Sequence, residues 1–395
     1  MTAETPATGP ASSALEGVRV LDLTHQVAGP SATLALAYMG ADVVKVVTPG
    51  SRDSYDALPF YLNNASKRSI ALDLKSEEGR ARLYELAEVA DVCIENFGPG
   101  VAERLGVTYE KLKERNPAII FAQIKGFAEE TKFRDYPAFD PIAQAYSGAS
   151  SITGAADGVP MRPGPDLGDT GTGMVVTSGI LAALYQRTRT GEGQHIRIAM
   201  ADQIATFMRI HYAWPIGMGR ATPRFGNNAP FTRPTGPSDV YPCAPFGPND
   251  YVHIHCGNDR QWARMAEAIG RPELATDERF ATEDARAENS EALDAIIIEW
   301  CSTKSKYEAM ETLGSAGVPA GAVRDTMDII QDEDLRERGI IVPVPHETLG
   351  EVPLVGWPIR MSGSRNVVKA PPRPGEHTEE VFEEWLGATR AAARG

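Results

Sequence analysis

The sequence predicts an α/β protein with two domains, the larger of which is built on a mainly parallel sheet covered by helices on both faces. Three observations predict this fold class. Short strand-like runs alternate with helical segments through the first half of the chain, which is the pattern of β-α-β units. The length of 395 residues is large for a single hydrophobic core. Hydrophobic residues make up 42% and charged residues 23%, as in ordinary globular domains.

The first half of the chain supplies the expected sheet. The stretch "VRVLDLTHQVAGPSATLALAYMGADVVKVV" reads as a strand, a helix and a second strand. The second expected helix, "SEEGRARLYELAEVA", carries acidic residues in its first turn and four apolar side chains along one face. The expected strands are 18–23, 42–47, 69–74, 91–96 and 118–124, and the expected helices are 30–39 and 76–90.

The second half of the chain is more helical and contains the expected domain boundary. Helices are predicted over 139–148, 170–188 and 201–218, with one more strand at 193–200. A loop-rich stretch at 220–250 separates a large domain, residues 1–222, from a smaller α+β domain, residues 223–325. That smaller domain begins with a predicted hairpin over 239–256, which turns at Gly247–Asp250. Residues 326–395 begin with strand-like runs and are expected to return to the large domain.

Composition and charge argue against several classes of protein. The net charge of −14 disfavours a nucleic-acid-binding protein, although a local basic pocket for a small anion is compatible with it. The four cysteines are scattered without a CxxC pair, which suits a reducing compartment and disfavours a disulfide framework or a zinc site. No apolar run approaches a membrane span, and residues 1–17 are expected to form a flexible leader. We therefore expect a cytoplasmic protein with no membrane partner and no metal.

The first strand-to-helix turn is a candidate ligand site. Its sequence, "THQVAGPSA", has a single glycine in place of GxGxxG, which disfavours a nicotinamide or flavin enzyme. The chain also lacks Walker, HExxH and GxSxG motifs. The turn still lies at the carboxyl end of a strand, where open α/β sheets bind ligands. His25 and Gln26 offer polar groups there and the next helix offers N–H groups to an anion, unless His25 only satisfies the turn.

Two further strand ends carry basic and polar side chains. Their combination with an aromatic ring suits a ligand that contains a purine and phosphates, because Arg and Lys bind phosphate and a flat ring packs on a base. The alternative is that each charge is only a solvated surface residue. The recurrence at successive strand ends favours the ligand site. These residues are Lys67, Arg68, Lys75, Asn96, Phe97 and Arg104.

Asp169 lies in the stretch "RPGPDLGDTGTG", residues 162–173, directly before a long apolar helix. Asp is a favoured N-cap, so a structural cap is one interpretation, and a catalytic nucleophile is the other. The two are compatible, because a helix N-terminus keeps a carboxylate ionised at neutral pH. Gly168, Gly171 and Gly173 are expected to let substrate and backbone approach closely.

Taken together, these motifs resemble those of the class III CoA-transferases, the CaiB/BaiF family. The segments are "LEGVRVLDLTHQVAGP", "NASKRSIALDL", "VCIENFGPG", "GDTGTGMVVTSGILAALYQRTRTGEGQHIRIAMAD" and "GVPAGAV", and the resemblance runs from about residue 15 to 385. Formyl-CoA transferase-like members are closest in motifs; carnitine CoA-transferases and α-methylacyl-CoA racemases belong to the same group. The resemblance implies a Rossmann-like large domain made from both chain ends, a smaller domain between them, and an interlocked-ring homodimer.

The resemblance also implies a reaction. Coenzyme A would pass from an acyl-CoA to a free carboxylic acid through an aspartyl anhydride and an aspartyl-CoA thioester, without a metal. The implied catalytic residues are Asp169, Asp140 and Gln26. The residues implied to bind coenzyme A are His25, Val27, Ala28, Leu72, Lys75, Asn96, Phe97, Arg104, Lys125 and Met200.

Departures from the family pattern bear on the substrate and the reaction. Phe139 occupies the position where racemases carry an acid–base histidine, which favours CoA transfer over the alternative of an acyl-CoA racemase or isomerase. A non-catalytic acyl-CoA-binding homologue is the third hypothesis, which the intact Asp169 disfavours. Val27 replaces a glutamine of formyl-CoA transferases, and the lid at 225–239 has bulkier residues, so the acids that react are left open. Three arginines in loops favour a dicarboxylic partner: Arg162, Arg224 and Arg233.

Overall fold

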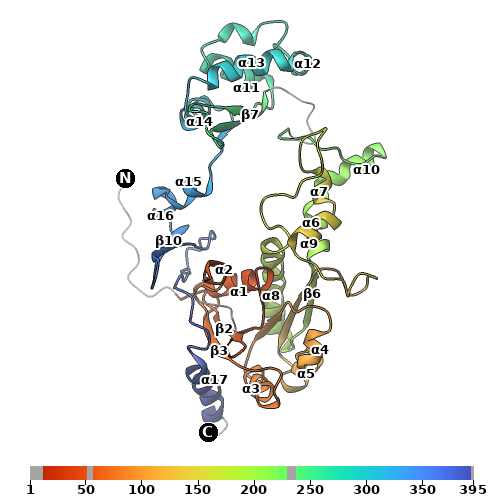
Figure 1. Ribbon diagram of the computed structural model, residues 1–395, viewed down its shortest axis with the longest axis vertical. Coiled ribbons are helices and arrows are strands. Elements are labelled where there is room, and N and C mark those ends of the chain that lie inside the picture. The colour runs from red at the N-terminus through yellow and green to blue at the C-terminus, as the bar shows by residue number, and fades with distance from the viewer. Residues whose placement is uncertain (1–11, 51–56, 229–236, 393–395) are drawn as a thin grey trace. The chain divides into compact units, whose positions relative to one another are not determined.

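The computed structural model describes residues 12–50, 57–228 and 237–392. The chain divides into two compact units (Figure 1). In the described part, unit 1 comprises 12–150, 162–210 and 334–392, and unit 2 comprises 151–161 and 211–333. The domain boundaries predicted at 222 and 325 stay predictions. Residues 1–11 of the predicted leader, Arg233 and residues 229–236 of the predicted lid lie outside the described residues.

Among the described residues of unit 1, six strands form one parallel sheet in the order β3-β2-β1-β4-β5-β6. The prediction of a mainly parallel sheet is therefore confirmed, and each predicted strand of unit 1 is present. The order reverses between β1 and β4, and open α/β sheets bind ligands at the carboxyl ends of the strands at such a point. The strands are β1 (Arg19–Asp22), β2 (Asp42–Val47), β3 (Arg68–Ala71), β4 (Val92–Glu95), β5 (Ile120–Lys125) and β6 (His195–Ala199).

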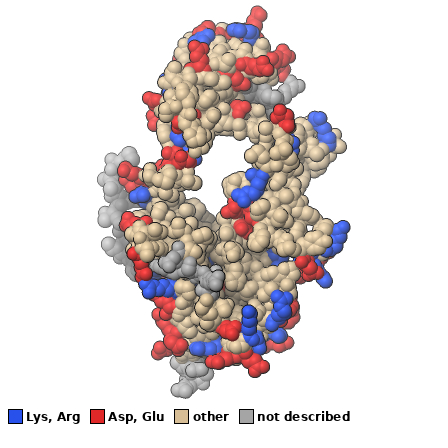
Figure 2. Space-filling model, viewed as in Figure 1, with Lys and Arg blue, Asp and Glu red and all other residues tan. Residues whose placement is uncertain are grey.

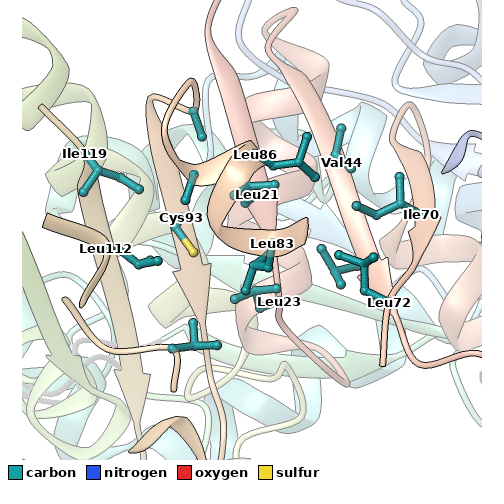
Figure 3. Close-up of a cluster of buried hydrophobic side chains, with 14 of the residues drawn as sticks. Leu21, Leu23, Val44, Ile70, Leu72, Leu83, Leu86, Cys93, Leu112 and Ile119 are labelled. Carbon is teal, nitrogen blue, oxygen red and sulfur yellow. The ribbon is translucent and has the colours of Figure 1, made fainter. Parts of the chain in front are cut away.

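Helices cover both faces of this sheet. Right-handed crossovers place the connections on the two sides of β1 on opposite faces. On one face, Leu21 and Ile70 from the strands pack against Leu83 of α3 (Glu77–Ala87), as Figure 3 shows. The same core includes Leu112 of α5 (Tyr109–Arg115) and Trp385 of α17 (Thr378–Ala392). Helices α1 (Ala28–Tyr38) and α8 (Thr170–Thr190) pack against each other and against the strands.

Local chemistry sets the ends of these helices. Ser76 caps α3 by accepting a hydrogen bond from the Gly79 N–H at 2.9 Å, and acidic residues follow it in the first turn. Helix α8 ends at Gly191, whose φ of 73° is readily adopted by glycine, with two arginines in its last turn. The helix predicted at 170–188 is therefore confirmed.

The end of the chain packs on the β3 edge of the sheet. Arg68 forms ion pairs with Glu380 and Glu384 of α17 at 2.9 and 2.7 Å, and the Trp385 indole donates to Asp42 at 2.8 Å. The hairpin of β10 (Ile341–His346) and β11 (Gly350–Val355) buries Val344 and Leu354 against side chains of α1 and of α2 (Leu58–Asn63). This edge of the sheet is thus covered by chain from the same unit.

Unit 2 contains a separate antiparallel sheet and its own core. Among its described residues, three strands pair in the order β7-β8-β9, and β7 with β8 confirms the predicted hairpin. Its core holds Trp262, Phe280 and Ile297. The strands are β7 (Ser238–Pro242), β8 (Tyr251–His255) and β9 (Ala320–Ala322). No helix among the described residues has the length and apolar character needed to cross a membrane.

The prediction of a single helix over 201–218 is wrong. Pro215 has no N–H to donate to the His211 carbonyl, which would be its partner in a continuous helix. The Thr222 hydroxyl donates to that carbonyl instead, at 2.6 Å. The segment forms α9 (Met200–Phe207), a 3-10 turn (Arg209–Tyr212) and α10 (Ala213–Met218).

The remaining helices are α2 (Leu58–Asn63), α4 (Val101–Leu105), α6 (Asp140–Tyr146), α7 (Ala149–Ile152), α11 (Asp259–Ala268), a 3-10 turn (Pro272–Ala275), α12 (Glu283–Glu288), α13 (Ser290–Cys301), α14 (Lys306–Ser315), α15 (Thr326–Ile330) and α16 (Glu333–Glu337).

Candidate active site

A cavity of ≈ 260 Å³ lies in unit 1, where β1, β4 and β5 end, at the point where the strand order reverses. Most of the predicted site residues line it. These are His25, Gln26, Ala28, Asn96, Phe97, Lys125, Asp169 and Met200. A second cavity of ≈ 200 Å³ shares His25 and Phe97 with the first and is lined by Leu72 and Lys75. The sheet therefore gathers residues from widely separated segments at one place.

Three predicted residues lie beside these cavities rather than in their walls. Val27 precedes α1 between Gln26 and Ala28, and Arg104 is exposed on α4, whose Val101 and Leu105 line the second cavity. Asp140 is buried behind the loop that carries Asp169.

Asp169 is the last residue before α8, and its carboxylate does not cap that helix. The residue occupies the N-cap position, but among the described residues its side chain makes no capping hydrogen bond to the helix. The interpretation of Asp169 as a side-chain cap is therefore wrong. The side chain lines the cavity instead, half-buried. A carboxylate left without the cap's hydrogen bonds is a candidate for chemistry.

The pKa of Asp169 is raised in the folded protein, so burial and neighbouring charges act on it in addition to the helix end. Burial is the largest cause, and the nearby carboxylates of Asp140 and Asp166 add to it, raising the pKa of Asp169 to about 6. At pH 7 roughly nine-tenths of such a group is ionised. The carboxylate is thus both charged at neutral pH and poorly solvated, which favours reactivity towards an electrophile.

Asp140 holds the backbone that carries Asp169. One of its carboxylate oxygens accepts hydrogen bonds from the Gly168 and Asp169 N–H groups at 2.7 and 3.3 Å. The other accepts from the Gln144 amide at 2.6 Å and lies 3.8 Å from the Arg162 guanidinium. Because both oxygens are engaged, the geometry assigns Asp140 to fixing the Asp169 loop.

The glycines around Asp169 serve the packing of the protein itself. A Cβ on Gly173 would lie 2.7 Å from the Ala28 carbonyl oxygen and 2.8 Å from the Ser31 Cβ, so only glycine lets α8 cross α1 this closely. A Cβ on Gly168 would lie 3.0 Å from an Asp140 oxygen. The expected close approach of the backbone is therefore confirmed at Gly173, and the expected approach of substrate to Gly168, Gly171 and Gly173 stays a prediction.

Asn96 ties the loop after β1 to the loop after β4. Its side-chain oxygen accepts from the His25 N–H at 2.7 Å, and its amide donates to the His25 carbonyl at 2.8 Å. The His25 and Phe97 rings lie 5.5 Å apart between their centroids. Gln26, next in the chain, has a φ of 60°, a left-handed conformation that is unfavourable for a residue other than glycine. Strain of this kind is concentrated at functional sites.

Glu95 is a site residue that the sequence reasoning missed. Its buried carboxylate accepts from the Phe97 N–H at 2.6 Å and from the Lys125 ammonium at 2.9 Å. Lys125 also donates to the Phe97 carbonyl at 2.8 Å. The pair therefore holds both backbone groups of Phe97. A glutamate at the end of the apolar run "VCIE" was the available signal, because such a residue requires a partner when it is buried.

Two basic residues predicted to meet a ligand have other partners. Lys67 is buried and bonds to Asp22 at 3.0 Å, and Arg68 pairs with Asp42 at 2.5 Å and with α17. Their interpretation as phosphate-binding residues is therefore wrong. Arg224 donates to the carbonyls of Ala155, Ser151 and Gly158, so its guanidinium already holds a loop of unit 2.

A loop between β5 and α6 completes the cavity wall, and the sequence reasoning identified Phe139 there but not Arg134 or Tyr136. Tyr136 and Phe139 line the cavity, with 57% and 68% of their surface exposed, and Arg134 lines it as well. Large apolar side chains left in contact with solvent at a cavity rim are typical of binding sites. The one available signal was the aromatic residue at 139.

Two observations bear on other ligand classes. On the face that Figure 2 draws, the described residues present acidic and basic side chains next to one another rather than one broad basic surface. Within the described ranges, no group of three or more His, Cys, Asp and Glu side chains is arranged to hold a metal ion.

The sequence and the fold are similar to those of known proteins. The model of CoA-transferase family III matches residues 15–378. A protein of Streptomyces coelicolor named formyl-CoA:oxalate CoA-transferase is 42% identical over 398 residues, covering 95% of this chain and 96% of that protein. One of the same name from Rhodopseudomonas palustris is 37% identical over 409 residues, covering 96% and 95%.

Solved structures give the same picture for the fold. A CaiB/BaiF family protein from Brucella suis superposes with a TM-score of 0.85 at 31% identity, covering 95% of this chain and 100% of that one. Rv3272 from Mycobacterium tuberculosis superposes with a TM-score of 0.79 at 28% identity, covering 94% and 99%.

Proposed function

The chain belongs to CoA-transferase family III, and from that premise we propose that it moves coenzyme A from an acyl-CoA to a free carboxylic acid through covalent intermediates on Asp169. The coarser activity, that of an acyl-CoA:carboxylate CoA-transferase, follows from the family. The observation that carries the finer proposal is the Asp169 carboxylate, which lines the cavity without capping its helix. The experiments below test whether Asp169 is the nucleophile and whether this cavity binds the substrates.

The proposed steps form and break one acyl bond at a time. The Asp169 carboxylate attacks the thioester carbonyl, and the CoA thiolate leaves, so that a mixed anhydride forms. The thiolate then attacks the aspartyl carbonyl of that anhydride, which releases the donor as a carboxylate and gives an aspartyl-CoA thioester. The acceptor carboxylate attacks this thioester and expels the thiolate again. Attack of the thiolate on the acceptor carbonyl of the new anhydride releases the product acyl-CoA and regenerates Asp169.

Residues of the two cavities are proposed to bind coenzyme A. Lys75 and Arg104 are exposed beside the second cavity and are suited to phosphate groups, while Leu72 and Phe97 offer apolar surface to the base. His25, Val27, Ala28, Asn96, Lys125 and Met200 are proposed to border the remainder of the cofactor. Gln26 is proposed to contact the reacting groups, because it lines the first cavity with Asp169.

The acid partner is proposed to be a small dicarboxylate. The support is the name of the relatives, formyl-CoA:oxalate CoA-transferase, together with Arg134 and Arg162 near the first cavity and its loop. Val27, in place of a glutamine of formyl-CoA transferases, leaves the identity of the acid to experiment. A panel of mono- and dicarboxylates with formyl-, acetyl- and succinyl-CoA would identify it.

We also propose the interlocked homodimer that the family resemblance implies. The described residues of each unit include large apolar side chains that are exposed to solvent in the single chain, among them Tyr185 at 67%, Ile210 at 62% and Ile216 at 84%. A dimer interface of the proposed kind would bury side chains like these. Analytical ultracentrifugation tests the proposal, and a monomer at assay concentrations contradicts it.

The observation that bears on the racemase alternative is Phe139. Its side chain lines the cavity with Asp169, and a phenyl ring exchanges no proton. An acid–base pair acting on the α-carbon would therefore lack one partner at this position.

Trapping the intermediate tests the proposed function. The protein is incubated with formyl-CoA or acetyl-CoA and then quenched with hydroxylamine, and digested peptides are analysed by mass spectrometry. A hydroxamate on the peptide that contains Asp169, absent from the Asp169→Ala variant, is expected. Turnover without any adduct would contradict the covalent route. Solvent deuterium at the α-carbon of a longer acyl-CoA, without an adduct, would support the racemase instead.

A further inference from the structure

Three charged side chains are buried together beneath the loop that follows β1. Asp22 ends that strand, Lys45 lies on β2 and Lys67 precedes β3, and their exposed fractions are 0%, 2% and 4%. The two lysines lie 3.5 and 3.0 Å from the Asp22 carboxylate. Burying three charges is unfavourable unless they are paired and hydrogen-bonded, so their arrangement calls for a specific role.

Lys67 reaches both the strand and the first turn of α1. Its ammonium donates to the Asp22 carboxylate at 3.0 Å, to the Pro30 carbonyl at 3.2 Å and to the Asn64 side chain at 2.8 Å. An ammonium has three N–H donors, so each of them has a partner here. One cation thus joins the end of β1 to the beginning of α1.

Asp22 and Lys45 fix the start of the same loop. The Asp22 carboxylate accepts from the Thr24 N–H at 2.9 Å and from the hydroxyls of Thr24 and Thr33 at 2.5 and 2.6 Å. The Lys45 ammonium donates to the Thr24 carbonyl. The Thr24 side chain fills the place where a Cβ on Gly29 would lie, 2.3 Å away, so the two ends of the loop are also in contact.

The residues between these anchors are the ones that reach the cavities. His25, Gln26 and Ala28 line the first cavity, and Gln26 is held with a φ of 60°. A left-handed conformation at a glutamine persists only when the surrounding structure enforces it. The anchors at Thr24 and Pro30 are on either side of that residue, so they are in a position to enforce it.

We propose that Lys67 is a positioning residue, which acts through the Asp22 carboxylate and the Pro30 carbonyl to hold residues 25–28 in the shape that binds coenzyme A. The proposal rests on the proposed function, because it takes this loop as part of the coenzyme A site. The Lys67 ammonium is buried and its three donors are engaged by protein groups, so its effect is on the geometry of the loop. A loop that is held in its binding shape before the ligand arrives loses less entropy on binding.

Lys67→Met tests the proposal in the full-length protein. The variant keeps the Asp22–Lys45 pair, so the remaining buried charges balance, and it removes the three hydrogen bonds that Lys67 donates to Asp22, Pro30 and Asn64. Binding is measured by calorimetry with desulpho-CoA, which lacks the reactive thiol, and turnover is measured with an acyl-CoA. We expect the dissociation constant and KM to rise about tenfold, while kcat changes by less than about threefold. Hydrogen exchange of the peptide spanning 24–33 should become faster.

Arg68→Met is the matched control. It removes a neighbouring basic side chain whose ion pairs are with Asp42 and with Glu380 and Glu384 of α17. A structural ion pair is lost in this variant, yet the dissociation constant for desulpho-CoA and the exchange of 24–33 should stay at wild-type values. Lys67→Gln keeps two N–H donors on a neutral side chain and should recover part of the affinity.

The outcomes separate this proposal from the proposed function. Wild-type affinity and wild-type exchange of 24–33 in Lys67→Met, in a protein that binds desulpho-CoA, would overturn the positioning role alone. If Lys67→Met does not fold, the same comparison is made with Lys67→Gln, and unchanged affinity there overturns the role. A wild-type protein that does not bind desulpho-CoA would overturn the coenzyme A site and this proposal together. Weakened binding in Lys67→Met with no adduct on Asp169 would uphold the positioning role and contradict the nucleophile.

Discussion

Asp22 and Asp169 are two carboxylates of one site with opposite surroundings. Both are shielded from solvent, and burial alone would raise both pKa values. Around Asp22, Lys45, Lys67 and the Thr24 and Thr33 hydroxyls outweigh burial and hold its pKa far below the usual range. Around Asp169 the neighbours are Asp140 and Asp166, which reinforce burial and raise its pKa to about 6.

The difference shows that the surroundings of a carboxylate decide whether it serves the structure or the chemistry. A carboxylate whose oxygens are all engaged contributes geometry, as Asp22 does at the end of β1. A carboxylate that makes no capping hydrogen bond among the described residues and lines a cavity keeps its electron pairs available, as Asp169 does before α8. Removing Asp169 should therefore cost turnover, and removing Asp22 should cost stability. Four experiments test this comparison.

Asp169→Ala should have the largest effect, on turnover. Removing a nucleophile lowers kcat by about 10⁴-fold or more, because no other group forms the acyl bond. The free energy of unfolding should not fall, since among the described residues the side chain makes no capping hydrogen bond to lose. Steady-state kinetics and urea denaturation measure the two quantities. Turnover within tenfold of wild type would show that Asp169 is not the nucleophile.

Asp22→Ala should have its main effect on the free energy of unfolding. It leaves Lys45 and Lys67 buried without their carboxylate, and breaking a buried pair in this way costs about 3–5 kcal/mol of the free energy of unfolding. Urea denaturation of the full-length protein gives the value. Glu88→Ala is the matched control, because it removes a surface pair with Arg115, of which both side chains are about half exposed. Such pairs contribute about 0–1 kcal/mol, and equal losses in the two variants would contradict the comparison.

These two residues also mark how far the sequence alone could predict the site. The strands of unit 1 were predictable because each is a short apolar run between helical segments. The pairing of Lys67 with Asp22 was not, since the partners are 45 positions apart: Asp22 ends β1 and Lys67 precedes β3, and these two strands are not neighbours in the sheet. From the sequence, a basic residue at a strand end is interpreted as a ligand contact. In the structure the charge of Lys67 is neutralised by the buried Asp22 carboxylate.

The surroundings of Asp169 were likewise only partly predictable from the sequence. The sequence identified the residue and the helix that follows it, but whether a side chain caps a helix depends on rotamers and neighbours. The Glu95–Lys125 pair and the cavity wall at Tyr136 and Phe139 arise from segments brought together only by the fold. The break between α9 and α10 was predictable in principle, because Pro215 cannot donate the hydrogen bond that a continuous helix requires there.

The pH dependence of turnover sharpens the comparison. Asp169 must be ionised to attack, so kcat/KM should fall about tenfold per pH unit below its raised pKa of about 6 and level off above it. Because the pKa is higher in the folded protein than in the unfolded one, the folded state binds more protons between about pH 4 and 6. The contribution of Asp169 to stability therefore decreases as pH rises through that range. Asp169→Asn should remove this contribution.

Asp166→Asn is the control for the pH profile. Asp166 is exposed and is one of the charges that raise the Asp169 pKa, so the acid limb should move to lower pH with little change in the plateau. An acid limb near pH 4 in the wild-type protein would contradict the unfavourable surroundings assigned to Asp169.

Gln26→Gly should give the smallest effect and tests whether the Asp22 network holds the loop under strain. Glycine adopts a φ of 60° without penalty, so the free energy of unfolding should rise by on the order of 1 kcal/mol, while loss of the side chain lowers kcat/KM. Phe246→Gly relieves a φ of 70° in unit 2 and should leave turnover unchanged. If Gln26→Gly instead lowers stability as measured by urea denaturation, the glutamine conformation is favourable in itself, and the buried charges beneath it are not needed to enforce it.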